Sequence, residues 1–186
     1  MREAQADYCC ICMKQKCIFF DRDGIVNVSP GPGYVERPED FHIIPEFISC
    51  AKIAVGLGYA IAIATNQRGV ARGIMTPESL AEIHAELVRV LESDNIPLLG
   101  IYCCPHERDS CDCRKPQPGL LLQAATEHNL DLSSSWMIGD SETDIEAGRR
   151  AGCRTIRVCD RDVETEADFR AADMEELAEK LEQIIG

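Results

Sequence analysis

The sequence predicts an α/β protein in which a central parallel sheet lies between two layers of helices. Short apolar runs, such as those at 17–20 and 59–64, alternate along the chain with longer segments of helical periodicity. Parallel strands need such crossovers, and the connecting helices cover both faces of the sheet. The chain has 186 residues, 45% of them hydrophobic, which is enough to build one core. We therefore expect a single three-layer α/β/α domain.

The first elements follow from apolar runs and helix-start signals. The run at 17–20 predicts a buried strand, and Gly24 permits a sharp turn after it. A helix is expected at 46–57, followed by a strand at 59–64. Thr76 suits the N-cap of the next helix and Pro77 its first turn. The apolar stripe of that helix comprises Leu80, Ile83, Leu87 and Leu91.

The same alternation continues to the C-terminus. A third strand is expected at 98–103, and Pro118 with Gly119 introduces a helix that extends to 128. The remaining segments are predicted as a strand at 135–139, a helix at 142–151, a strand at 153–158 and a closing helix at 174–185. Roughly twenty residues separate Gly24 from the first predicted helix, too few for an independent lid domain.

Net charge and cysteine usage narrow the classes of partner and compartment. The formal net charge is −13, whereas proteins that bind nucleic acid or anionic membranes favour basic surfaces. The segment at 1–15 lacks the apolar core of a signal peptide, and no apolar stretch is long enough for a membrane span. We expect a cytoplasmic protein with an N-terminal extension at 1–15 and one domain at 16–186. In that compartment its 11 cysteines are expected to be thiols or metal ligands.

Polar motifs directly follow three of the predicted strands. In open parallel sheets, sites form outside the carboxyl ends of the strands, so we expect these motifs to line one cleft. Residues two apart in an extended strand point the same way, which brings Asp21 and Asp23 together, and close carboxylates need a neutralising cation. The three motifs are Asp21-Arg22-Asp23, Thr65-Asn66-Gln67 and Gly139-Asp140.

Mg²⁺ is the cation that this donor set favours. It takes hard oxygen ligands and keeps several waters, so a few protein oxygens suffice. We assign its ligands to the side chains of Asp21 and Asp140 and to the carbonyl oxygen of Asp23. Asp144 follows Asp140 by four residues near a helix start. It is expected either to cap the turn or to orient a ligand, a metal-bound water or a lysine.

The same residues suit phosphoryl transfer. Asp21 is expected to attack phosphorus, and Asp23 to protonate the leaving oxygen and later deprotonate the water that hydrolyses the phosphoenzyme. The Thr65 hydroxyl and Lys115 are expected to stabilise the equatorial phosphate oxygens. The alternative for Lys115 is a solvated surface lysine, but its place between Cys113-Arg114 and Pro116 favours the site.

A cysteine cluster predicts a second metal. Cys104, His106, Cys111 and Cys113 supply three thiolates and one imidazole, a complete tetrahedral zinc set without an open position. We expect structural Zn²⁺, because the loop has almost no apolar residues to pack. The loop runs into Arg114 and Lys115, so the zinc would hold those cations over the cleft. Near the N-terminus, Cys9 and Cys12 have no second pair of comparable spacing, and free thiols are expected there.

Taken together, the motifs resemble those of the haloacid dehalogenase (HAD) superfamily of phosphatases. This resemblance implies a Rossmann-like fold without a large cap domain, with Asp21 as the nucleophile and Asp23 as the acid/base. It also implies that Thr65 and Lys115 bind phosphate and that Asp140 is a Mg²⁺ ligand. The likeness covers roughly residues 16 to 160. The matching residues are Asp21-Arg22-Asp23-Gly24, Thr65-Asn66-Gln67, Arg114-Lys115-Pro116 and Gly139-Asp140 with Asp144.

The zinc loop narrows the resemblance to one branch of the superfamily. That branch contains D-glycero-D-manno-heptose-1,7-bisphosphate 7-phosphatases and histidinol-phosphate phosphatases. Gly33-Tyr34-Val35 and the segment at 65–73 are similar to the heptose enzymes, although Ile25 stands where the family commonly has Thr and Arg68 where the heptose enzymes have Ser. The resemblance implies substrate contacts by Tyr34, Asn66, Gln67, Arg68 and Arg114.

The leading expectation is a monomeric, Mg²⁺-dependent phosphomonoesterase that acts on heptose bisphosphate through an aspartyl-phosphate. A second phosphate would be contacted by a group of arginines, namely Arg68, Arg72, Arg108 and Arg114. The alternatives are a phosphatase of histidinol phosphate or another small phosphorylated metabolite, and a zinc-binding scaffold without catalysis. The intact set of site residues argues against the scaffold.

Overall fold

The computed structural model describes residues 14–186, and a six-stranded parallel sheet forms its centre. The strand order is β3-β2-β1-β4-β5-β6, and each neighbouring pair is parallel. The strands are β1 (Cys17–Phe20), β2 (Ala60–Asn66), β3 (Leu98–Cys104), β4 (Trp136–Gly139), β5 (Arg154–Val158) and β6 (Phe169–Ala171). The strand order reverses beside β1, which places the carboxyl ends of β1, β2 and β4 next to one another.

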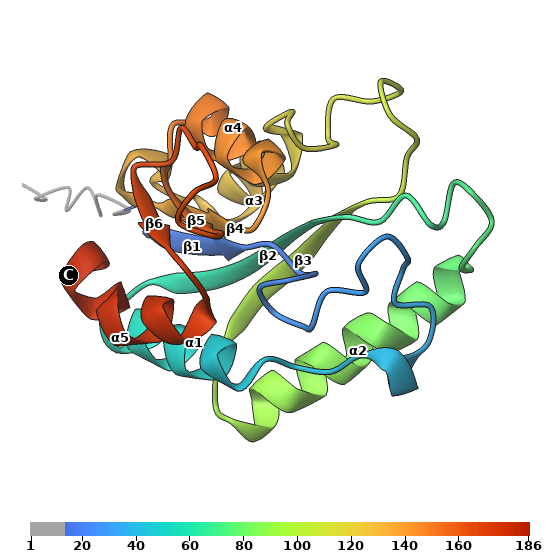
Figure 1. Cartoon of the computed structure of the whole chain (residues 1–186), viewed down its shortest axis with the longest axis horizontal. Coiled ribbons are helices and arrows are strands. Elements are labelled where there is room, and N and C mark those ends of the chain that lie inside the picture. The colour runs from blue at the N-terminus through green and yellow to red at the C-terminus, as the bar shows by residue number, and fades with distance from the viewer. Residues whose placement is uncertain (1–13) are drawn as a thin grey trace, which may run out of the picture.

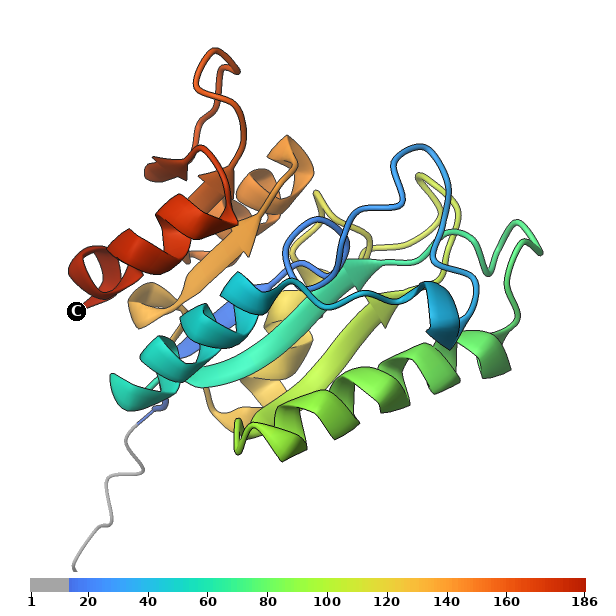
Figure 2. The ribbon, with the colours of Figure 1, turned by 60° about the horizontal axis from the view of Figure 1, so that its bottom comes forward.

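Helices cover both faces of this sheet, as Figures 1 and 2 show. On one face lie α1 (Pro45–Gly56), α2 (Pro77–Ser93) and α5 (Met174–Ile185), with α1 packed along α5. On the other face lie α3 (Gly119–His128) and α4 (Glu142–Ala151). Short 3-10 helices occupy Pro38–Asp40 and Leu132–Ser134. The predicted three-layer α/β/α fold is therefore confirmed.

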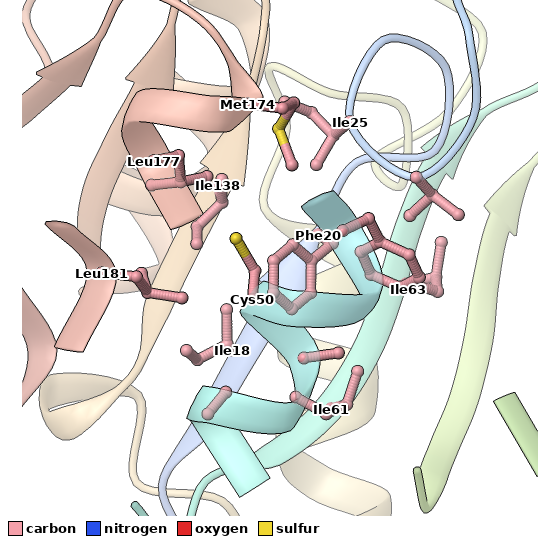
Figure 3. Close-up of a cluster of buried hydrophobic side chains, with 14 of the residues drawn as sticks. Ile18, Phe20, Ile25, Cys50, Ile61, Ile63, Ile138, Met174, Leu177 and Leu181 are labelled. Carbon is pink, nitrogen blue, oxygen red and sulfur yellow. The ribbon is translucent and has the colours of Figure 1, made fainter. Parts of the chain in front are cut away.

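The buried faces of the strands explain why these layers form. Ile18 and Phe20 point to the α1 and α5 side, whereas Cys17 and Phe19 belong to the separate cluster under α3. Figure 3 shows Phe20 and Ile63 from the sheet packed with side chains of α1 and α5. Burying each large apolar side chain contributes roughly 1.5–3 kcal/mol. Because both faces of the sheet are apolar, each needs its own layer of helices.

The helix α2 forms as its sequence predicts. The Thr76 hydroxyl accepts a hydrogen bond from the backbone N–H of Ser79 at 3.1 Å, which makes Thr76 the N-cap. The four residues of the predicted stripe, Leu80, Ile83, Leu87 and Leu91, are all buried.

The last strand, β6, escapes the sequence analysis. It has only three residues, and Phe169 and Arg170 are both exposed, so no apolar run marks it. The strand pairs with β5 through Phe169 opposite Ile156. The carboxylate of Asp168 accepts hydrogen bonds from the backbone N–H and the hydroxyl of Thr155, at 2.7 and 2.9 Å. A polar clamp therefore holds this strand, and hydrophobic periodicity does not reveal it.

The expected N-terminal extension lies almost wholly outside the described residues, together with Cys9, Cys10 and Cys12. Just before β1, the backbone N–H of Gln15 donates to the carbonyl of Asn129 at 3.2 Å. Between residues 14 and 186, no helix has both the length and the apolar character needed to cross a membrane.

Candidate active site

The predicted polar motifs meet in one cavity of about 220 Å³ at the carboxyl edge of the sheet. Its lining comes from the ends of β1, β2 and β4, from the start of α4 and from the segment before α3. The expectation of a common cleft is thus met, because strand ends that are distant in sequence are adjacent in the sheet. The lining residues are Asp21, Asp23, Thr65, Asn66, Lys115, Asp140, Ser141, Thr143 and Asp144.

The turn after β1 brings carboxylates into close approach. The backbone N–H of Asp21 donates to the carbonyl of Ile138 at 2.9 Å, which fixes it beside the end of β4. Gly24 has a φ of +93°, a conformation that L side chains rarely adopt. A Cβ at this position would also lie 2.2 Å from Asp140 Oδ2. Glycine is therefore required both by the turn and by the Asp140 carboxylate.

Lys115 connects two of these carboxylates. Its Nζ lies 2.6 Å from Asp21 Oδ1 and 2.5 Å from Asp144 Oδ1, and it donates to the carbonyl of Ala64 at 2.6 Å. Only 2% of the Lys115 side chain is exposed, so it is not a surface lysine. Burial by itself would lower the pKa of Lys115, but the Asp144 and Asp21 carboxylates raise it above its usual value. The ammonium is therefore a fixed positive charge beside Asp21.

Asp144 performs two of the tasks predicted for it. Its Oδ2 accepts hydrogen bonds from the backbone N–H and the hydroxyl of Ser141, at 3.1 and 2.7 Å, and forms a capping box at the start of α4. Its other oxygen pairs with Lys115. Gly139 leaves room for this carboxylate, since a Cβ there would lie 2.4 Å from Asp144 Oδ2. Asp144 therefore both caps the helix and orients the lysine.

The acidic cluster fits a divalent cation. Oxygens of Asp21, Asp140 and Asp144 lie within 4.8 Å of one another. Burial raises the pKa of Asp21 to about 7, with Lys115 offsetting part of the effect, and burial together with Asp144 raises the pKa of Asp140 to about 6. Raised pKa values in crowded carboxylates indicate negative charge that the surrounding protein does not compensate, and a bound cation would compensate it. Carboxylate oxygens are hard donors, which Mg²⁺ prefers. The residues present therefore fit the predicted magnesium site.

Asp23 has a different environment from Asp21. Its carboxylate accepts hydrogen bonds from three side chains, those of Arg22, Asn27 and Gln67. Neither Arg22 nor Asn27 is among the site residues that the sequence predicts. The sequence carries no signal for them. In the structure, three backbone N–H groups of the Asp21–Asn27 turn donate to the carbonyl of Arg22.

The residues of Thr65-Asn66-Gln67 hydrogen-bond to other site residues, and Thr65 and Asn66 also line the cavity. The Asn66 side chain bonds to the backbone N–H and carbonyl of Lys115, each at 3.0 Å, so it holds the lysine segment against β2. The amide of Gln67 is buried and donates to Thr65 Oγ1 at 2.9 Å and to Asp23 Oδ2 at 2.8 Å. Substrate contacts by Asn66 and Gln67 stay a prediction, and the bonds made by both side chains are to other site residues.

The four predicted zinc ligands lie together. Their ligand atoms are all within 4.8 Å of one another, and His106 Nδ1 lies 3.6 Å from Cys104 Sγ and 3.3 Å from Cys113 Sγ. Cys111 Sγ lies 3.5 Å from Cys104 Sγ and 3.3 Å from Cys113 Sγ. Ligand atoms in a tetrahedral zinc site are roughly 3.5–3.8 Å apart. The cluster therefore fits a zinc ion, and Cys103, next to it in β3, is outside the set.

The predicted arginines gather around the same loop. Arg68 and Arg72 share the carboxylate of Glu107, at 3.1 and 3.5 Å, and Arg114 donates to the carbonyl of His106 at 3.4 Å. Arg108 is exposed in that loop, and Tyr34 is half-buried, in close approach to Gly69. The second-phosphate contacts predicted for the arginines remain predictions. In this structure, Arg68 and Arg72 are paired with an acidic side chain.

Ile25 has a packing explanation. Its side chain is fully buried and points into the hydrophobic cluster near Met174 (Figure 3). A threonine hydroxyl at this position would lie in apolar surroundings and not toward the cavity, so the departure from the family pattern leaves the cavity lining unchanged.

Comparison with known proteins places this chain in a family. The family described as HAD-hydrolase-like matches residues 112–183. D-glycero-β-D-manno-heptose-1,7-bisphosphate 7-phosphatase of Photorhabdus laumondii is 38% identical over 164 residues, which cover 83% of this chain and 86% of that enzyme. This chain belongs to the HAD-like hydrolases. The D-glycero-α-D-manno-heptose-1,7-bisphosphate 7-phosphatase of Campylobacter jejuni is 34% identical, covering 84% of this chain and 89% of the relative.

A solved structure supports the same assignment for this HAD-like hydrolase. The D,D-heptose 1,7-bisphosphate phosphatase of B. bronchiseptica, crystallised with magnesium and phosphate, superposes with a TM-score of 0.81. It is 30% identical and covers 91% of this chain and 99% of its own. The fold, the phosphatase class and the use of Mg²⁺ predicted from the sequence agree with these findings.

Mg²⁺ is expected to stabilise the metal-free HAD-like hydrolase against heat. At about 100 times the dissociation constant, binding adds roughly 2.7 kcal/mol, which corresponds to about 5–10 °C in a domain of this size. Differential scanning fluorimetry with Mg²⁺ and with chelator measures the shift, on protein whose zinc content is checked to be constant. Asp140→Asn should respond to Mg²⁺ by a far smaller shift. An equal response in that variant would contradict the ligand assignment.

Proposed function

We propose that this protein hydrolyses the 7-phosphate of D-glycero-D-manno-heptose 1,7-bisphosphate through a phosphorylated Asp21. The observation that carries the proposal is the convergence of Asp21, Thr65, Lys115 and Asp140 in one cavity. The relatives from Photorhabdus laumondii and Campylobacter jejuni, each similar over more than four fifths of this chain, are phosphatases of a heptose 1,7-bisphosphate, which supports the choice of substrate.

Asp21 carries the covalent step. Its carboxylate oxygen attacks phosphorus, and the bond from phosphorus to the sugar oxygen breaks as the new bond forms. The Lys115 ammonium, 2.6 Å from Asp21 Oδ1, orients the nucleophile and offsets charge on the phosphoryl oxygens. The Thr65 hydroxyl, at the end of β2, is placed to donate to one of those oxygens. Asp144 and Asn66 keep Lys115 in place.

Asp23 carries the proton transfers. It donates a proton to the leaving sugar oxygen in the first step and removes one from water in the second, when the phosphoryl group leaves Asp21. Its side chain is 26% exposed, so substrate and water can reach it, whereas Asp21 is mostly buried. One carboxylate therefore acts as the nucleophile and the other as the acid/base.

Two metals support these residues. Asp21 and Asp140 would hold Mg²⁺, which when bound offsets the negative charge of the phosphoryl group. Cys104, His106, Cys111 and Cys113 would hold Zn²⁺, which folds the loop that precedes Lys115. Arg68, Arg72 and Arg114 surround that loop and supply the positive charge that a second phosphate group needs.

A substrate panel tests the choice of bisphosphate. Phosphate release with Mg²⁺ is measured for the α and β anomers of heptose 1,7-bisphosphate, for heptose 7-phosphate and for histidinol phosphate. We expect kcat/KM to be highest for a bisphosphate anomer, and at least about tenfold above heptose 7-phosphate, since a charge-assisted contact is worth roughly 1.5–3 kcal/mol. A preference for histidinol phosphate would reject the substrate. Inactivity on every phosphomonoester would instead support a non-catalytic scaffold.

A further inference from the structure

We propose that Arg22 is a positioning residue that holds the Asp23 carboxylate in the orientation needed for proton transfer. The inference rests on the proposed function, in which Asp23 is the acid/base. Its basis is the hydrogen-bonded cluster of Arg22, Asn27 and Gln67 around the Asp23 carboxylate.

Arg22 bonds to both oxygens of Asp23. Its Nη2 lies 3.0 Å from Oδ1 and 3.1 Å from Oδ2, and its Nε lies 3.3 Å from Oδ1. A planar guanidinium that contacts both carboxylate oxygens restricts rotation about the last bond of the side chain. Arg22 therefore controls the direction in which the Asp23 oxygens face.

Two amides complete the cluster from different parts of the chain. Asn27 Nδ2 donates to Oδ1 at 3.0 Å, and Gln67 Nε2 donates to Oδ2 at 2.8 Å. Asn27 lies in the same turn as Asp23, whereas Gln67 follows β2 and also donates to Thr65. Each oxygen is thus held by the guanidinium and by one amide.

Arg22 cannot act on the substrate directly. None of its side chain is exposed, and it does not line the cavity, whereas 26% of the Asp23 side chain is exposed. Whatever Arg22 contributes to the reaction must therefore pass through Asp23.

A purely structural role explains Arg22 less well. The turn uses its backbone carbonyl, which any residue supplies, and its Nη1 has no partner among residues 14–186. The hydrogen bonds of its guanidinium within that range all go to Asp23. The guanidinium also lies over the Phe41 ring, 5.9 Å from its centroid, a packing contact that an apolar side chain could also make. A buried ion pair that is replaced as a whole by apolar groups is often neutral for stability, so stability alone gives little reason for the pair. What the arginine adds is a fixed orientation of its partner.

The test separates the two chemical steps by the leaving group. In Arg22→Met, turnover of an alkyl phosphate, including the sugar phosphate, is expected to fall about 10- to 100-fold in kcat. With p-nitrophenyl phosphate, the leaving phenolate needs no proton, so the rapid release of one equivalent should persist. Hydrolysis of the phosphoenzyme, which needs the base, should still slow. Arg22→Lys keeps the charge without the two-oxygen contact and should fall between Arg22→Met and the wild type.

A double-mutant cycle decides between orientation and general damage. If Arg22 acts through Asp23, then adding Arg22→Met to Asp23→Asn changes kcat little beyond Asp23→Asn alone. The inference would be overturned if the losses in kcat multiplied in the double variant. It would also be overturned if Arg22→Met lost the rapid release of one equivalent from p-nitrophenyl phosphate as well as the steady turnover. Should Arg22→Met fail to fold, the same cycle with Arg22→Lys gives the same two outcomes.

The proposed function and this inference fail in different ways. If the wild-type enzyme prefers another phosphomonoester, the proposed substrate is wrong, but the double-mutant cycle can still be measured with that ester. A wild-type protein without phosphatase activity rejects both. An active wild type with multiplicative losses rejects the role of Arg22 alone.

Discussion

Replacing Asp21 with asparagine is expected to lower phosphate release by about 10⁴-fold or more, because an amide oxygen cannot form the covalent intermediate. In the structure Asp21 directly follows β1, contacts Lys115 and lies with an oxygen within 4.8 Å of an Asp140 oxygen. Asp144 is not free to take its place, since its oxygens are engaged by Ser141 and Lys115. The measurement is the initial rate of phosphate release with saturating Mg²⁺, together with trapping of the phosphoenzyme.

The same variant should keep its fold, which makes the loss of activity interpretable. Burial raises the pKa of Asp21 to about 7, against an ordinary value of 3.8. A raised carboxyl pKa means that the folded state binds the proton more tightly, so stability from this group falls as the pH rises from about 4 to about 7. In the absence of Mg²⁺ at pH 8, the unfolding temperature of Asp21→Asn should therefore be no lower than that of the wild type. Activity within about tenfold of the wild type would reject Asp21 as the nucleophile.

Replacing Cys113 with serine is expected to release the zinc and to lower kcat on the order of 10²-fold. Structural zinc contributes roughly 10–16 kcal/mol of binding free energy to a folded site, so its loss is expected to disorder the loop. A displacement of about 1 Å in a catalytic group can lower the rate on the order of 10²-fold. Cys113 lies two residues before Lys115, whose ammonium contacts Asp21. Loss of the zinc is therefore expected to displace Lys115 and, with it, the contact that Lys115 makes with Asp21. Zinc content by elemental analysis and kcat on the same preparation measure the effect.

Cys103→Ser is the matched control for this variant. Cys103 lies in β3 beside the ligand Cys104, but it is not part of the cluster. It should retain both the zinc and the activity. A Cys113→Ser protein that keeps full activity after losing its zinc would show that the loop does not position Lys115. Equal losses in both variants would show that the effect is not specific to the predicted zinc ligands.

Most of the fold follows from local patterns in the chain. The α-helices and five of the strands have their predicted places to within one or two residues, because short apolar runs mark the buried strands and the longer segments between them mark the helices. The two short 3-10 helices were not predicted. β6 lacks such a run and is held beside β5 by backbone pairing and by contacts such as that of Asp168 with Thr155. No pattern of hydrophobic residues records a contact of that kind.

The site divides in the same way. Residues with chemistry of their own, such as Asp21 and Lys115, stand out because they follow buried strands or lie between unusual neighbours. Arg22 and Asn27 do not, since an arginine or asparagine in a turn is ordinarily solvated. Their burial and their bonds to Asp23 appear only once the turn folds against the sheet. Likewise, nothing in the motif at 65–67 indicates that Asn66 would bond to the backbone of Lys115.

By itself, the sequence indicated the layers of the fold, the carboxylates that gather at the site and the cysteine-histidine set proposed to hold zinc, because periodicity and close spacing can be read along the chain. Only the tertiary structure decided how those groups are neutralised and oriented. Lys115 lies between Asp21 and Asp144, Glu107 pairs with Arg68 and Arg72, and a buried Arg22 holds Asp23. The physical reason is that charge compensation and orientation depend on distances between residues that come together only when the sheet and its loops have packed.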